Sequence, residues 1–90
     1  MTSSSKGTLV FKVVEGDFVR DTETFGQMDP KVEILFEGKS FETTEKPDAG
    51  KHPVWNESFD LEILETSVAI RLICKDVNPA FDDIIGEAIV

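Results

Sequence analysis

The amino-acid sequence predicts an all-β domain, built as an antiparallel sandwich or barrel of short strands. Apolar and polar residues alternate with a period of two in six separate segments, whereas no segment has the apolar stripe of an amphipathic helix. Runs rich in Gly, Pro, Asp and Asn separate the six segments, as is typical of turns between strands. The chain has 90 residues, of which 40% are hydrophobic, so it suffices for one small domain with a modest core.

The limits of the strands follow from where the alternation starts and stops. Residues 1–7 are small and polar, and we expect them to form a disordered lead before a single domain at 8–90. Strands are predicted at residues 9–14, 32–36, 40–44, 55–63, 68–74 and 84–90. In the fourth strand, Trp55, Phe59 and Leu61 share one face, so we expect Trp55 to belong to the core.

The charge of the chain excludes one class of partner. It carries 18 acidic and 9 basic residues, a formal net charge of -9, and would be repelled by the phosphates of nucleic acids. Its single cysteine, Cys74, alternates with apolar residues and is expected to be buried; the lack of a second cysteine favours a cytoplasmic location. No apolar stretch is long enough to span a bilayer, so we expect any membrane contact to be peripheral.

Oxygen-bearing side chains gather in two of the polar interruptions, at residues 15–30 and 76–83. They are Asp21, Glu23 and Asp29 in the first, and Asp76, Asn78, Asp82 and Asp83 in the second. Loops at one end of a sandwich can meet in space, and carboxylates gathered there repel each other unless a cation compensates them. Calcium takes about six to eight oxygen ligands in a flexible shell, whereas zinc prefers nitrogen and sulfur. The pattern therefore predicts a calcium site.

Three segments of the chain carry motifs. Residues 25–32 read FGQMDPKV, residues 52–59 read HPVWNESF, and residues 76–78 and 82–87 read DVN and DDIIGE. In this order the three segments resemble motifs of the C2 domain family. The first resembles its Gly-Lys-x-Asp-Pro-Tyr-Val signature, with Lys31 where tyrosine is usual. The second resembles its Asn-Pro-x-Trp-Asn-Glu-x-Phe motif, and the third is similar to its third-loop pattern. The layout is similar to the type II arrangement of small single-domain plant and protist members.

The resemblance implies a Greek-key β-sandwich in which acidic residues of two loops bind calcium. The implied ligands are Glu23, Asp29, Asp76, Asn78 and Asp82 or Asp83, with Asp21 as a substitute for Glu23. Glu23 and Asn78 replace aspartates of the family pattern, so fewer or weaker calcium sites are expected. The family has eight strands where this sequence predicts six. We therefore expect the last strands to be lacking, and additional chain or a partner's strand to complete the sandwich.

Two functions follow from this resemblance, and neither is enzymatic. The first is calcium-dependent binding to an anionic phospholipid surface, with Phe81 and Phe25 entering the bilayer unless they fold back on the core. The alternative is a calcium-insensitive protein–protein interaction or scaffold domain within a larger assembly. An enzyme is not expected, because the sequence has one His and one Cys and neither a glycine-rich phosphate loop nor a nucleophile elbow.

Overall fold

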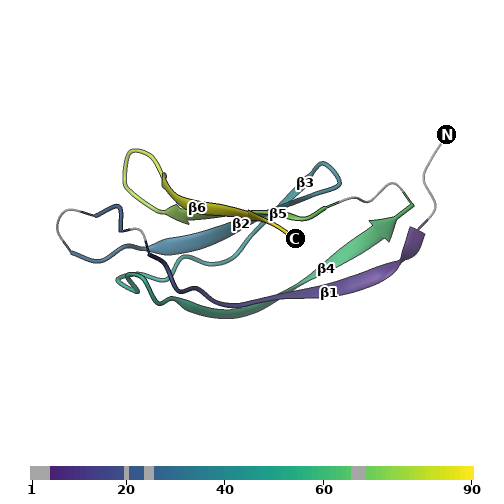
Figure 1. Cartoon of the computed structure of the whole chain (residues 1–90), viewed down its shortest axis with the longest axis horizontal. Helices are drawn as coiled ribbons and strands as arrows, with labels where there is room; N and C mark the ends of the chain where they lie inside the picture. The colour runs from purple at the N-terminus through teal and green to yellow at the C-terminus, as the bar shows by residue number, and fades with distance from the viewer. Residues whose placement is uncertain (1–4, 20, 24–25, 66–68) are drawn as a thin grey trace.

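Six β-strands form the described part of the molecule (Figure 1). The computed structural model describes residues 5–19, 21–23, 26–65 and 69–90. The strands are β1 (Ser5–Glu15), β2 (Pro30–Phe36), β3 (Lys39–Glu42), β4 (Val54–Leu64), β5 (Arg71–Asp76) and β6 (Asp83–Ile89). Within the described residues no segment is helical, as the alternation in the sequence predicts.

The strands form two antiparallel sheets that face each other. β1 and β4 make a two-stranded sheet, and the other sheet has four strands in the order β3-β2-β5-β6. β1 and β4 pair along most of their length, with Leu9 opposite Leu61 and Phe11 opposite Phe59. Figure 1 shows this pair as one layer and the four remaining strands as a second layer. The predicted antiparallel sandwich is confirmed.

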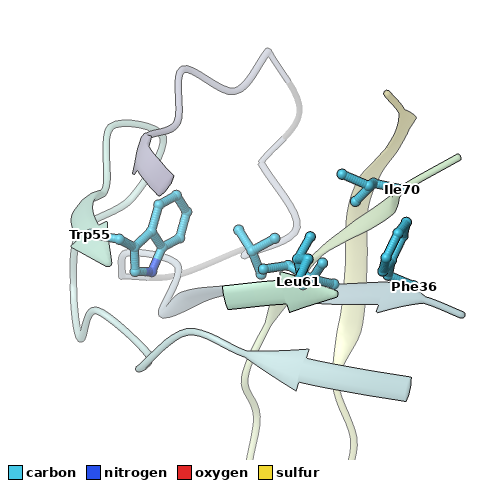
Figure 2. Close-up of a cluster of buried hydrophobic side chains, with 6 residues drawn as sticks. Phe36, Trp55, Leu61 and Ile70 are labelled. Atoms are coloured by element: carbon cyan, nitrogen blue, oxygen red, sulfur yellow. The ribbon is translucent and has the colours of Figure 1, made fainter. Parts of the chain in front are cut away.

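The core lies between the sheets and is built by the inward-facing half of each strand. In β2, Ile34 and Phe36 are buried while their neighbours are partly exposed, because successive side chains of a strand point to opposite faces. Trp55 and Leu61 of β4 belong to the same cluster. Figure 2 shows the cluster running from Trp55 at one end, past Leu61, to Phe36 and Ile70.

Trp55 is a structural residue, as the sequence predicts. It is 5% exposed, and its Nε1 donates a hydrogen bond to the carbonyl oxygen of Thr44 at 3.0 Å. Its ring lies edge-on to Phe18, with the ring centroids 6.5 Å apart. Because the indole N–H has an acceptor, burying it carries little desolvation cost. Trp55 therefore anchors the ends of two loops against the core.

Two strand limits differ from the sequence prediction. β1 begins at Ser5, which pairs with Leu64, so residues 5–7 belong to a strand and not to a disordered lead. Pairing with the long β4 outweighs the weak strand preference of small residues. Residues 1–4 lie outside the described residues. β5 begins at Arg71, later than predicted, and Val68 also lies outside the described residues.

Cys74 is less buried than the sequence predicts. It lies on β5 opposite Val32, on the inward face, but is only partly covered because a two-stranded layer opposes a four-stranded one. Leu72 on the same face is also partly exposed. Burial is still sufficient to raise the pKa of the Cys74 thiol. The thiol is therefore a poor nucleophile at neutral pH.

Three connections lie together at one end of the sandwich, at the left of Figure 1. They are residues 16–29, 43–53 and 77–82, and we call this region the loop end. The hairpin between β2 and β3 lies at the opposite end. The fold therefore brings the two acidic segments to the same end of the molecule, as the sequence predicts.

Candidate cation site at the loop end

Backbone hydrogen bonds join the three loops of the loop end to one another. The amide of Val77 donates to the carbonyl oxygen of Asp29 at 3.1 Å, which ties loop 77–82 to loop 16–29. The amide of Gly50 donates to the carbonyl oxygen of Met28 at 3.0 Å, which ties loop 43–53 to the same segment. Met28 is itself completely buried. The backbone that carries the acidic side chains is therefore held from both sides.

Asp76 is the central acidic residue of the loop end. It is the last residue of β5 and lies opposite Pro30, the first residue of β2, so the sheet register sets its position. Its side chain is completely buried. One carboxylate oxygen accepts a hydrogen bond from the Thr22 hydroxyl and the other from the Asp29 amide, each at 2.8 Å. Asp76 thus links the first acidic loop to the four-stranded sheet.

Asp29 connects the same site to loop 43–53. Its carboxylate accepts a hydrogen bond from the amide of Asp48 at 2.7 Å. Asp48 has a φ of 56°, in the left-handed region, which short polar residues such as Asp tolerate better than most. Neither Thr22 nor Asp48 is singled out by the sequence motifs. The only signal for Asp48 is its position in a Pro-Asp-Ala-Gly turn, which gives no indication of its partner.

Glu23 faces the other acidic side chains rather than solvent alone. A hydrogen bond with Asp76 and partial burial raise the pKa of Glu23 from its usual 4.5 to about 6. The negative charges of Asp76, Asp29 and Asp83 act in the same direction. These four residues, Glu23, Asp29, Asp76 and Asp83, are called the acid group below. Their negative charges repel each other in the absence of a cation.

Asn78 braces the acid group from loop 77–82. Its side-chain amide donates to the Asp83 carboxylate at 3.0 Å and lies 3.4 Å from the Asp76 carbonyl oxygen. An amide donor partly compensates the charge of Asp83 without supplying a positive charge. Asn78 therefore lies beside the acid group, with its NH₂ rather than its oxygen turned toward Asp83.

Two predicted ligands are turned elsewhere. The Asp82 carboxylate lies 3.6 Å from the Lys31 ammonium, whereas its neighbour Asp83 belongs to the acid group. Successive residues at the start of a strand point to opposite faces, so only one of the two reaches the site. Asp21 is exposed, and its carboxylate accepts a hydrogen bond from the Glu23 amide at 2.9 Å, within a local turn. Asp21 therefore shapes the loop that carries Glu23.

Exposed apolar side chains project from two loops of the loop end. Phe81 is 66% exposed, so it does not fold back on the core. Phe25 lies outside the described residues. Val19, which the sequence motifs do not single out, is 98% exposed in loop 16–29. The sequence gives little indication that Val19 is exposed, because its neighbour Phe18 is also apolar and yet packs on Trp55.

The chemistry of the acid group fits a hard cation such as calcium, because its donors are all oxygens. The arrangement of the side chains is not that of a completed shell. Among the described residues, no three or more His, Cys, Asp or Glu side chains are arranged as a group that could hold a metal ion. The oxygens of Asp76 already accept hydrogen bonds from Thr22 and Asp29. Binding a cation through Asp76 would therefore compete with these two hydrogen bonds.

The fold is a two-sheet antiparallel sandwich whose loops are joined at one end. The chain belongs to the C2 domain family, whose profile matches residues 7–90. Members of this family typically bind calcium, membranes or proteins. None of the described residues forms a helix long and apolar enough to cross a membrane.

The relatives agree with this assignment. The chain is 30% identical to the 16 kDa phloem protein 1 of Arabidopsis thaliana over 93% of this chain, and it spans 58% of that protein's length. A C2 domain of plant extended synaptotagmin 1 is 24% identical, with a TM-score of 0.85 over 97% of this chain and 70% of its own. The calcium-bound pair of C2 domains of extended synaptotagmin 2 is 21% identical, with a TM-score of 0.88 over 99% of this chain and 35% of its own. Both solved structures support the fold.

Proposed function

We propose that this chain is a calcium-dependent phospholipid-binding module and not an enzyme. The observation that carries the proposal is the acid group, which gathers four carboxylates from two loops. A hydrogen bond with Asp76 is the main cause of the raised pKa of Glu23, and the negative charges of Asp76, Asp29 and Asp83 add to it. A divalent cation would remove this repulsion, since carboxylates gathered in one place favour a cation among them. The proposed location is the cytoplasm, at the surface of an anionic membrane.

The loop end would meet the membrane in two ways. Calcium held by the acid group would also bind lipid phosphate, so that an acidic surface repelled by anionic lipid becomes an attracted one. The exposed side chains of Phe81 and Val19 would then enter the interface. Burial of a Phe side chain contributes about 1.5–3 kcal/mol, which is comparable to several electrostatic contacts at a membrane surface.

Calorimetric titration with calcium, followed by cosedimentation with phosphatidylserine vesicles, tests the proposal. We expect saturable calcium binding, and sedimentation with vesicles in calcium but not in chelator. Phosphatidylcholine vesicles are the control for charge, and magnesium is the control for the ion. Equal sedimentation in calcium and in chelator, or none in either, would make calcium-dependent docking untenable.

The alternative function is a calcium-insensitive protein interaction or scaffold domain. The observation that favours it is that the Asp76 carboxylate is already satisfied by Thr22 and Asp29, while Asp82 is paired with Lys31. Carboxylates that already accept hydrogen bonds from donors within the chain gain less from a cation than carboxylates without such donors. Under this alternative, calcium would bind weakly or not at all, and vesicles would not be sedimented with the protein.

The unequal sheets favour a protein partner under either function. Two strands oppose four, so Leu72 and Cys74 on the inward face of β5 are only partly covered. We propose that a further strand, from additional chain or from a partner, covers this face. Unpaired strand edges and exposed apolar side chains are the usual acceptors of an added strand. Light scattering that finds a cooperatively folded monomer of these 90 residues would count against this proposal.

A further inference from the structure

Lys31 is positioned between a strand end and the acidic loop 77–82. It lies on β2, on the outer face of the four-stranded sheet, because the adjacent Val32 is buried in the core. Its ammonium is 3.2 Å from the Glu42 carboxylate at the end of β3 and 3.6 Å from the Asp82 carboxylate. The side chain is 19% exposed, so its aliphatic part is largely covered, and its ammonium lies near these two carboxylates.

The surroundings keep Lys31 charged. Although partial burial on its own would lower the pKa of Lys31, the hydrogen bond and negative charge of Glu42 and the charge of Asp82 outweigh it and raise the pKa. The ammonium therefore carries a full positive charge at neutral pH. It forms an ion pair with Asp82, and the next residue, Asp83, belongs to the acid group.

We propose that Lys31 is an intramolecular counter-ion that competes with calcium for the loop end. By pairing with Asp82, it turns that carboxylate to the outer face and withholds one negative charge from the acid group. Lys31 would thus lower the calcium affinity of the module and set the calcium concentration at which it docks. The inference rests on the proposed function, because it concerns the affinity of the same site.

Lys75 offers a matched control on the same face. It lies directly opposite Lys31 in the sheet register and is 21% exposed, close to the 19% of Lys31. Its ammonium pairs with Glu33 at 3.2 Å, away from the acidic loops. Removing either lysine changes the net charge equally and shortens neither strand. Any difference between the two variants therefore reports the pairing with Asp82 rather than the overall charge.

The test is calorimetric titration with calcium chloride of wild type, Lys31→Met, Lys31→Arg and Lys75→Met. An exposed ion pair is worth about 0.2–1 kcal/mol, and loss of the nearby positive charge adds to this. We therefore expect Lys31→Met to bind calcium about three- to tenfold more tightly, whereas Lys31→Arg and Lys75→Met stay within about twofold of wild type. In the Asp82→Asn background, Lys31→Met should give little further gain.

A second readout does not depend on calcium. In chelator, amide hydrogen exchange at residues 77–82 should be faster in Lys31→Met than in Lys75→Met, because the loop loses its ion pair. Thermal unfolding of all variants checks that each remains folded.

The outcomes separate this inference from the proposed function. If wild type binds calcium and Lys31→Met binds no more tightly, the counter-ion role is wrong while calcium binding stands. If only Lys31→Met binds calcium, the counter-ion role is supported and calcium-dependent docking by wild type is wrong. If the gain persists unchanged with Asp82→Asn, or if no variant binds calcium, the counter-ion role is overturned.

Discussion

The outer face of the four-stranded sheet and the loop end are both highly charged, but they arrange their charges in opposite ways. On the outer face, Lys75 pairs with Glu33 at 3.2 Å and Arg71 with Glu87 at 2.9 Å. Ile73 lies on the same face of β5 and is only 7% exposed. At the loop end, by contrast, acidic side chains of the acid group face one another.

The pKa values of two glutamates express this difference. A hydrogen bond from Ser40 and the pairing with Lys75 lower the pKa of Glu33, against the opposite effect of partial burial. Hydrogen bonding to Asp76 and the neighbouring carboxylates raise the pKa of Glu23 to about 6. On the outer face, Glu33 and Glu87 are each paired with a basic side chain of the same chain. At the loop end the neighbouring carboxylates are like charges, and perturbed groups of this kind are typical of functional sites.

The largest expected effect is on stability, at the buried member of the acid group. Asp76→Ala removes the acceptor of the Asp29 amide and of the Thr22 hydroxyl, and leaves a partly buried N–H without a partner. We expect the free energy of unfolding, measured in urea, to fall by about 2–4 kcal/mol. Arg71→Met, which breaks an exposed ion pair of the outer face, should cost less than about 1 kcal/mol. Equal losses would mean that the two regions are held together in the same way.

The next effect is stabilisation by calcium. An ion that binds only the folded state adds about 2.7 kcal/mol at one hundred times its dissociation constant, so millimolar calcium should raise Tm clearly and magnesium less. Glu23→Gln with Asp83→Asn should erase this shift, because both residues belong to the acid group. Glu33→Gln with Glu87→Gln removes the same amount of charge from the outer face, and this double variant should retain the calcium-induced rise in Tm. Loss of the shift in both double variants would indicate nonspecific screening.

A smaller effect concerns the apolar tip of the loop end. Phe81 is 66% exposed next to the acidic residues of its loop, so Phe81→Ala should leave folding and calcium affinity without lipid nearly unchanged. Binding to phosphatidylserine vesicles in calcium should weaken about tenfold or more. Ile89 is 76% exposed on β6, and Ile89→Ala is the matched control that should retain vesicle binding. If the two variants weaken vesicle binding equally, the contact is not specific to the loop end.

The smallest effects are pH dependences of opposite sign, measured in chelator as the free energy of unfolding. Because the pKa of Glu23 is raised from 4.5 to about 6 in the folded protein, protonated Glu23 contributes to the free energy of unfolding below pH 4.5. This contribution is lost as the pH rises through about 6. Because the pKa of Glu33 is lowered, its contribution is present above 4.5 and is lost as the pH falls through its folded value. Glu23→Gln and Glu33→Gln should each remove only their own trend. A trend of the same sign for both glutamates would contradict the contrast between the two regions.

Much of the fold follows from the sequence because strands obey a local rule. Alternation with a period of two requires only neighbouring residues, and it predicts the inward positions of Ile34, Phe36 and Trp55 correctly. Strand ends are less local, and β1 begins at Ser5 because β4 is long enough to pair with it. The partial exposure of Cys74 depends on the width of the opposing sheet, which no property of its own segment reveals.

The candidate site shows the same division. Residue type and motif order alone identify two acidic segments and predict that they meet at one end of a sandwich, because acidic loops between strands are visible in the chain itself. The tertiary structure decides that Asp83 joins the acid group while Asp82 turns to Lys31, and that Val19 is exposed. It also supplies Thr22 and Asp48 as partners of Asp76 and Asp29. In irregular loops no period fixes the direction of a side chain, so contacts with residues distant in the sequence determine it.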